Sequence, residues 1–357
     1  MISVMGWDIG GANTKAVFVR TKNGQVIEFR IIIRYFPIWK EPEKLVDVLS
    51  MLKEKVSGSV KLDGVGLTMT AELSDAYQTK REGVNHILAC AAQAFDGLPI
   101  FVLDVSAALR SIEDARSEPL SVAAANWAAT GWLVGRLIKT CVIVDVGSTT
   151  TSIIPVIDGR VLAAGENDLE KLTVGELVYT GSLRTNVAAI VSSVPLRDCT
   201  VPVASELFAQ SADIHLILGN ITEKEYIGET VDGREKTRDR ALARLARIVC
   251  ADIEMLTEKE IVKITKYVYN KQIKQIAEGL NQVYSRVRSL TTEKIPVVVT
   301  GLGKDFLGRA AAKCLRVDEI IDLSKLIPND VFKASPAAGV ALIAASKFER
   351  RIVEWKL

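Results

Sequence analysis

The sequence predicts an α/β protein with a duplicated architecture, in which two lobes each contain a mixed β-sheet flanked by helices and enclose a cleft. Two observations indicate this fold. An apolar strand ending in Asp, a turn rich in Gly and hydroxyl residues, and a second apolar strand occur twice, at 4–15 and 142–151. Each copy is followed by further strands and helical stretches, as expected of an internal duplication. With 357 residues, 48% of them apolar, the chain is long enough for a core in each lobe.

The first half opens with strands rather than with a nucleotide-binding βαβ unit. Lys15-Ala16-Val17-Phe18-Val19 directly follows the first Gly turn and is typical of a strand, whereas a Rossmann or Walker motif requires a helix there. Asn23-Gly24 predicts a hairpin between the second and third strands. The strands are expected at 2–8, 15–21, 25–33, 64–70 and 100–103, and the helices at 43–55 and 84–94.

The second half repeats this order. We expect a connecting helix at 122–135, strands at 141–145, 152–157, 160–164 and 296–300, and helices at 257–290, 306–314 and 335–345. In the long helix at 257–290, apolar residues recur every three or four positions, with one double step. The lobes are predicted at 1–120 and 121–357, and the terminal helix is left free to return to the first lobe.

Composition excludes several classes of function. The net charge of +2 and the 6% of aromatic residues give no support to nucleic-acid binding. No apolar run is long enough for a membrane span and no leader is evident, so a cytoplasmic protein with small-molecule partners is expected. Two His residues without metal-ligand spacing make zinc chemistry improbable. The five Cys residues are predicted to be reduced core thiols. A homodimer is retained as an alternative to a monomer.

The two turns predict a clamp for a polyphosphate and Mg²⁺. Backbone N–H groups and hydroxyls bind phosphate oxygens, and a strand-terminal carboxylate holds the cation, directly or through water. Asp8 and Asp145 are the predicted metal ligands, with water-mediated contact favoured. Lys15 is expected to act as a point charge for the phosphates unless strand alternation turns it to solvent. The predicted phosphate-binding residues are Gly10, Gly11, Asn13, Thr14, Gly147, Ser148, Thr149 and Thr150.

The turns, the Ala-rich connecting helix and Val299-Thr300-Gly301-Leu302-Gly303 resemble the actin, sugar kinase and Hsp70 superfamily, whose actin-like, ribonuclease H-like fold is duplicated. Within it the hydantoinase and oxoprolinase branch is most similar. Three phrases resemble the archaeal methanofuran-biosynthesis synthase family: Thr68-Met69-Thr70-Ala71-Glu72-Leu73-Ser74-Asp75, Thr79-Lys80-Arg81-Glu82-Gly83 and Gly175-Glu176-Leu177-Val178-Tyr179-Thr180-Gly181. This resemblance implies a transferase of one-carbon metabolism that joins an aminomethylfuran-methyl diphosphate to γ-glutamyltyramine, forms an aryl ether and releases diphosphate.

That reaction requires a base for the phenol, whose ordinary pKa is near 10, or an electrophile that a neutral phenol can attack. Glu72 leads the candidate bases over Asp75, Asp145 and Glu176, with a capping or exposed carboxylate as the alternative for each. Lys80 and Arg81, in an expected polar loop, would close over the diphosphate or remain solvated. Arg184 would pair with the glutamyl carboxylate or with a protein carboxylate. Further substrate contacts are expected from Thr70 and Glu176. The turn with Gly301 and Gly303 would receive the furan amine or be a simple strand-to-helix turn.

Two other classes of function stay open at this stage. The paired turns alone also fit an ATP-dependent kinase or a hydantoinase-like or oxoprolinase-like hydrolase. A non-catalytic nucleotide switch is the third class. Binding of ATP with Mg²⁺ would favour either of these over the transferase.

Overall fold

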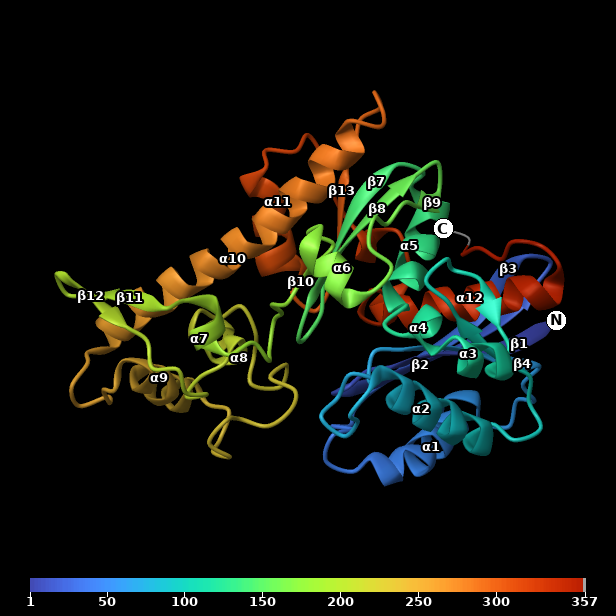
Figure 1. Cartoon of the computed structure of the whole chain (residues 1–357), viewed down its shortest axis with the longest axis horizontal. Helices are drawn as coiled ribbons and strands as arrows, with labels where there is room; N and C mark the ends of the chain where they lie inside the picture. Colours follow the sequence, from blue (N-terminus) through green and yellow to red (C-terminus); the bar gives the residue numbers. More distant parts are fainter. Residues whose placement is uncertain (356–357) are drawn as a thin grey trace. The chain divides into compact units, whose positions relative to one another are not determined.

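The computed structural model describes residues 1–355, apart from the side chain of Asn329. The chain forms two compact units, shown with their elements in Figure 1. Unit 1 comprises Met1–Cys141, Ile154–Lys171 and Asp322–Leu357, and unit 2 comprises Val142–Ile153 and Leu172–Ile321. This grouping differs from the predicted division at residues 120 and 121, which refers to the duplicated halves.

The sheet of unit 1 confirms the predicted run of strands. It is ordered β3 (Gln25–Tyr35), β2 (Asn13–Lys22), β1 (Ile2–Ile9), β4 (Gly64–Met69), β5 (Ile100–Leu103) and β6 (Leu109–Arg110). β1, β2 and β3 are antiparallel neighbours, whereas β1, β4 and β5 run parallel. Asn23 and Gly24 both have positive φ, at 54° and 80°, as a two-residue hairpin turn requires.

Helices cover both faces of this sheet. They are α1 (Leu45–Ser57), α2 (Lys80–Ala94), α3 (Ile112–Ser117), α4 (Pro119–Val122), α5 (Asn126–Leu137) and α12 (Ser335–Glu349). Trp7 and Leu67 point from β1 and β4 into a core that includes the apolar residues of α1 and α2. The Trp7 and Phe95 rings lie 5.0 Å apart in that core. Because strand residues alternate, Gly6 and Asp8 face the opposite side.

That opposite side is covered by α12. A Cβ at Gly6 would lie 2.0 Å from the Ala337 carbonyl oxygen, and one at Gly66 would lie 2.8 Å from that of Val340. Glycine therefore permits this close helix–strand packing. Among the described residues, the segment Asp330–Glu349 is long and apolar enough to span a membrane, but 72% of its apolar window is buried in the protein. This burial is typical of a core helix.

The second sheet has the same organisation at its centre. It is ordered β10 (Leu177–Val178), β8 (Thr151–Ile157), β7 (Cys141–Val146), β13 (Val297–Gly301) and β14 (Ile320–Asp322), with β9 (Arg160–Val161) beside the end of β8. β7 and β8 are joined by a short turn, and β7 runs parallel to β13. The set β7, β8 and β13 repeats the set β1, β2 and β4. The predicted duplicated actin-like fold is thereby confirmed.

The remaining elements surround this second sheet or form a small lobe of unit 2. They are α6 (Asp168–Thr173), α7 (Val187–Ile190), α8 (Ser211–Ile217), α9 (Arg238–Ala246), α10 (Glu258–Arg288), α11 (Arg309–Cys314) and the hairpin β11 (Ser193–Leu196) and β12 (Cys199–Pro202). α10 confirms the long predicted helix, and the hydroxyl of Thr257 caps it by accepting a hydrogen bond from the Glu260 N–H.

Three sequence expectations need correction. The connecting helix at 122–135 is interrupted between α4 and α5, where Ala124 has φ of 52°. The helix at 306–314 is a π-helical turn at Lys304–Gly308 followed by α11. All five thiols are free, but only Cys90 and Cys141 lie in the core, whereas the other three are exposed.

Candidate functional site

Each Gly turn contains an equivalent internal hydrogen bond. The N–H of Gly10 donates to the carbonyl of Asn13 at 3.0 Å, and the N–H of Gly147 donates to the carbonyl of Thr150 at 2.9 Å. These bonds are formed within the turns, so the N–H groups of Gly10 and Gly147 are already used. The phosphate-binding prediction therefore applies to the other N–H groups and hydroxyls of each turn.

The aspartates before the turns occupy equivalent places in their sheets. Asp8 is in register with Thr68 on the neighbouring parallel strand, and Asp145 is in register with Thr300. The structure thus places an Asp and a Thr side by side at the carboxyl ends of two parallel strands in each unit. Sequence analysis did not include Thr68, although its position in a strand that ends beside Asp8 was a usable signal.

Asp8 and Lys15 form an ion pair in unit 1. They are directly opposite each other on β1 and β2, and Lys15 Nζ donates to Asp8 Oδ2 at 3.0 Å. Asp8 is 2% exposed, and its Oδ1 is buried with no hydrogen-bond partner among residues 1–355. A buried carboxylate oxygen without a donor is costly, so Oδ1 is a suitable acceptor for a cation or for metal-bound water.

Thr14 does not lie with Lys15. It is opposite Ile9 and therefore faces the α1 and α2 side of the sheet. Its hydroxyl, like that of Thr68, is buried and has no hydrogen-bond partner in the described part of the chain. Asn13 Oδ1 is in the same state. Thr68 shares the face of Asp8, and so does Asn13, which is two residues from Lys15 on β2.

Glu72 has the environment of a general base. The residue follows β4, where the N–H groups of Thr70 and Ala71 both donate to the Ile9 carbonyl, at 2.9 and 3.1 Å. The Glu72 side chain is 1% exposed, and burial raises its pKa to about 7. The nearby N–H groups of Glu72 and Ala124 and the charge of Lys80 lower this pKa, and the charge of Asp168 raises it. Neither carboxylate oxygen has a hydrogen-bond partner among residues 1–355, so burial is the dominant cause. A carboxyl group of this kind exchanges a proton near neutral pH.

Lys80 and Arg81 belong to α2 rather than to the expected polar loop. Thr79 caps the helix by accepting a hydrogen bond from the Glu82 N–H. Lys80 Nζ donates to Asp168 Oδ2 at 2.7 Å, whereas Arg81 is exposed. Lys80 is thus held beside Glu72 by a carboxylate that sequence analysis did not single out. Asp75 is exposed and therefore lacks the burial that distinguishes Glu72.

The second turn is supported by the loop at 181–184. Ser182 donates from both its N–H and its hydroxyl to the Gly147 carbonyl, each at 2.9 Å. The N–H groups of Leu183 and Arg184 donate to the Ser148 carbonyl, also at 2.9 Å. A Cβ at Gly181 would lie 2.6 Å from the carbonyl carbon of Thr149. The backbone of the loop therefore packs directly on the turn.

Other predicted residues have structural partners. Glu176 is buried, and its carboxylate accepts a hydrogen bond from Arg286, which favours a structural role. Gly301 has φ of 85°, and a Cβ there would lie 2.5 Å from Asp145 Oδ1. The N–H of Gly303 donates to the Val146 carbonyl at 3.0 Å. Gly301 and Gly303 are thus required for close packing beside Asp145.

The donor set fits a magnesium ion that keeps most of its water. No cluster of three or more His, Cys, Asp or Glu side chains is present among the described residues. Mg²⁺ is commonly held by one or two carboxylates together with substrate phosphates. The unpartnered Asp8 Oδ1 would be such a ligand in unit 1. Asp145, half-buried at the corresponding strand end, is its counterpart in unit 2.

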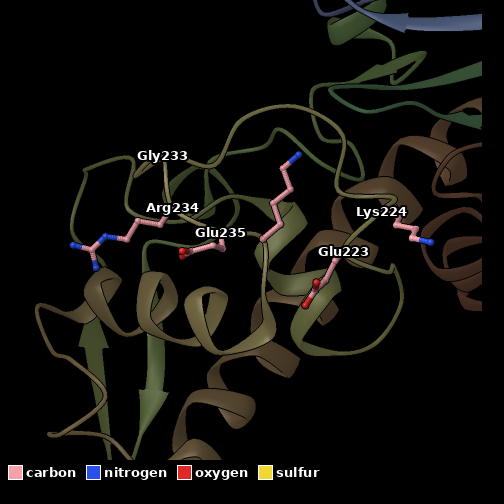
Figure 2. A pocket seen from close by; sticks show the side chains of 6 residues that line it. Glu223, Lys224, Gly233, Arg234 and Glu235 are labelled. Carbon is pink, nitrogen blue, oxygen red and sulfur yellow. The ribbon is translucent and has the colours of Figure 1, made fainter.

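A surface hollow of about 540 Å³ lies elsewhere, between the segments before α9. Figure 2 shows Arg234, Glu235, Glu223 and Lys224 at this hollow, with side chains that do not converge on one point. Glu235 is also paired with Arg240 at 3.1 Å. The hollow combines charges of both signs with no convergent set of donors, so we do not assign it to the site.

The fold and the two turns define the class of protein as a duplicated actin-like protein with a Gly turn after an Asp-containing strand in each half. Residues 63–347 match the Hydantoinase/oxoprolinase family. The chain is 38% identical over 98% of its length, and 99% of the relative's, to the (4-{4-[2-(gamma-L-glutamylamino)ethyl]phenoxymethyl}furan-2-yl)methanamine synthase of Methanocaldococcus jannaschii. It is 32% identical to the synthase of the same name from Methanococcus vannielii, over 60% of this chain and 95% of that one. The chain therefore belongs to the hydantoinase/oxoprolinase family and, within it, to these furan-methanamine synthases.

A solved structure supports the fold independently. The nucleotide-free structure of acetone carboxylase, from work on ATP-dependent acetone carboxylation, aligns with 96% of this chain and 70% of its own at a TM-score of 0.51 and 9% identity. At this identity the likeness concerns the fold alone.

Proposed function

We propose that this enzyme forms the aryl ether of the methanofuran precursor by joining an aminomethylfuran-methyl diphosphate to γ-glutamyltyramine, with release of diphosphate. The observation that carries the proposal is the 38% identity over nearly the whole chain to a synthase whose name describes a phenoxymethyl-furan product. That product contains a bond between a phenol oxygen and a furylmethyl carbon. A synthase that makes it must form this C–O bond.

The bond changes define what the site must do. The phenol oxygen attacks the methylene carbon, the bond from that carbon to the diphosphate oxygen breaks, and diphosphate leaves with the electron pair. The phenol proton passes to a base. The furan ring is electron-rich and stabilises positive charge that develops on the methylene carbon. The protein therefore has to stabilise the departing anion and to accept one proton.

The first turn supplies groups for the departing anion. Lys15 lies 3.0 Å from Asp8 and is a fixed positive charge that diphosphate oxygens can approach. Mg²⁺ would be held through Asp8 Oδ1 and would neutralise charge on the diphosphate. In unit 2, the N–H and hydroxyl donors of Ser148 and Thr149 would bind phosphate oxygens at the second turn.

Glu72 would accept the phenol proton, directly or through one water molecule. Its pKa of about 7 means that a large fraction of the carboxyl is ionised at neutral pH and that the group is more basic than an exposed glutamate. The same burial excludes bulk water from the proton transfer. Glu72 and Lys15 thus divide the work between base and anion stabiliser.

Calorimetric titration of the purified protein with inorganic diphosphate and with ATP, each with Mg²⁺, tests this assignment. We expect diphosphate to bind and ATP not to bind measurably at the same concentrations. Tight ATP binding without diphosphate binding would instead support a kinase, an ATP-driven hydrolase or a nucleotide switch. Titration of the Asp8→Asn variant with diphosphate shows whether the binding heat comes from the site at Asp8, because binding there should be weakened in this variant.

A further inference from the structure

A hydrogen-bond relay, buried except at its Asn220 end, lies behind the second Gly turn, in unit 2. It begins at Asn220, which is half-buried and whose Nδ2 is 3.2 Å from His215 Nδ1, and continues from the buried His215 Nε2 to the buried Gln272 Oε1 at 3.1 Å. Gln272 Nε2 then donates to Thr180 Oγ1 at 2.9 Å and to the Gly181 carbonyl at 2.8 Å. The relay connects α8 and the middle of α10 to the loop that supports the turn.

The Gly181 carbonyl determines which group donates and which accepts in every hydrogen bond of the relay. The Gly181 carbonyl can only accept, so the Gln272 amide must present its NH₂ group there. Gln272 Oε1 must then accept from His215, which places the imidazole proton on Nε2. His215 Nδ1 consequently accepts from Asn220. Burial lowers the pKa of His215 to about 3, so the ring is neutral, as this arrangement requires.

The loop that Gln272 holds contacts the second turn on its other side. Gly181 packs on the backbone of Ser148 and Thr149, where a Cβ would lie within 2.7 Å of backbone atoms. The hydroxyl of Thr151, the first residue of β8, donates to the Thr180 carbonyl at 2.8 Å. Thr185 Oγ1 accepts from the Gly181 N–H at 2.9 Å. A shift of residues 180–181 would therefore move the turn.

Gln272 also breaks the pattern of its own helix. Most of the buried side chains of α10 are apolar, but Gln272 is fully buried between Val268 and Ile276. A polar group in such a place is unfavourable unless its hydrogen bonds are made, and here both ends of the amide are satisfied. An apolar residue would fill the position without the relay, so packing alone does not require glutamine.

We propose that Gln272 is a positioning residue that, through Thr180 and Gly181, sets the geometry of the Ser148–Thr149 turn for binding diphosphate. This inference rests on the proposed function, because it takes diphosphate as the ligand of the turn. It concerns a residue on α10 that acts through the loop and does not itself contact substrate.

The test compares Gln272→Met with Gln275→Met. Gln275 is half-buried on the same helix and makes a 3.5 Å bond to the Ile190 carbonyl, on α7 and outside the relay. Thr180→Val removes the same hydrogen bond from the loop side and serves if Gln272→Met does not fold. Amide hydrogen exchange over 147–151 and 180–185 is measured together with the affinity for inorganic diphosphate with Mg²⁺.

We expect Gln272→Met or Thr180→Val to increase exchange at 147–151 and to weaken diphosphate binding by about tenfold or more, while Gln275→Met changes neither. Unchanged exchange at 147–151 in a folded Gln272→Met protein would overturn the inference. Equal losses of affinity in Gln272→Met and Gln275→Met would also overturn it. If the wild-type protein binds no diphosphate, the proposed function fails, and altered exchange at 147–151 still shows that the relay sets the turn.

Discussion

Lys15 Nζ donates a hydrogen bond to Asp8 Oδ2 at 3.0 Å across β1 and β2, while the second oxygen of Asp8 is buried without a donor. One of the two Asp8 carboxylate oxygens thus has the Lys15 ammonium group as its hydrogen-bond donor, and the other has none among residues 1–355. This arrangement orients the free oxygen and keeps the ammonium group at the end of the strand. In the proposed mechanism, both groups contact the metal–diphosphate ligand.

Asp8→Asn is expected to reduce turnover by about 100-fold or more, because the amide cannot hold Mg²⁺ as a carboxylate does and no longer orients Lys15. The residue keeps its size, so the protein should remain folded. Steady-state kinetics at saturating Mg²⁺ measures the effect. Asp47→Asn, an exposed change on α1, is the matched control. Full activity in Asp8→Asn would remove this carboxylate from the mechanism.

Lys15→Ala is expected to weaken inhibition by diphosphate by about tenfold, because a positive charge close to the anion is lost. The inhibition constant for diphosphate measures this directly. Lys22→Ala, at the exposed end of β2, provides the comparison. An inhibition constant equal to that of the wild type would mean that Lys15 only balances the charge of Asp8.

Glu72→Gln is expected to lower kcat/KM by 10² to 10⁴-fold. It should also abolish the fall of kcat/KM at acidic pH, which is the acidic limb of the pH profile. The base acts in its ionised form, so in the wild type kcat/KM should rise with pH up to about 7 and level off above it. A pH profile of both proteins checks this. An acidic limb near pH 7 that persists in Glu72→Gln would assign the limb to another group.

Glu72 should also affect stability in a defined direction. Its pKa is raised in the folded protein, so between about pH 4.5 and about 7 the folded state binds more protons than the unfolded state. The free energy of unfolding should therefore fall by about 3 kcal/mol as pH rises through this range. Glu72→Gln should lack this fall, whereas Glu54→Gln, an exposed change on α1, should retain it. Parallel curves for all three proteins would contradict the burial of an ionisable Glu72.

Lys80 and Asp168 should shift the pKa of Glu72 in opposite directions. Lys80→Met removes a positive charge and should move the acidic limb of kcat/KM to higher pH, whereas Asp168→Asn should move it to lower pH. The double variant should lie between the two. Shifts of the same sign in both single variants would show that neither acts on Glu72 through charge.

The fold was largely predictable because its strands carry strong local signals. Asn23-Gly24 and the repeated Asp and Gly turns place the hairpins, and apolar periodicity places α10. The break at Ala124 could not be predicted, because an alanine with positive φ is imposed by packing and has no signature in the sequence. The exposure of Cys199, Cys250 and Cys314 was missed for the same reason, since aliphatic neighbours do not determine tertiary burial.

The site was predictable only in part. Asp8 and Lys15 are related by hairpin geometry, and that same alternation places Thr14 on the other face. The partner of Lys80, Asp168, is 88 residues away and has no local signal. Gln272 did leave a trace, because it occupies the double step in the apolar pattern between Val268 and Ile276. Such a gap in a long buried helix indicates a buried polar contact.

The most direct test of the central claim is a single reaction with purified protein, Mg²⁺, synthetic aminomethylfuran-methyl diphosphate and γ-glutamyltyramine. Mass spectrometry of the product and an assay of released diphosphate are measured together. We predict one aryl ether formed for each diphosphate released, with both dependent on Glu72 and Asp8. Release of diphosphate without ether formation, or ether formation only when ATP is added, would contradict the account.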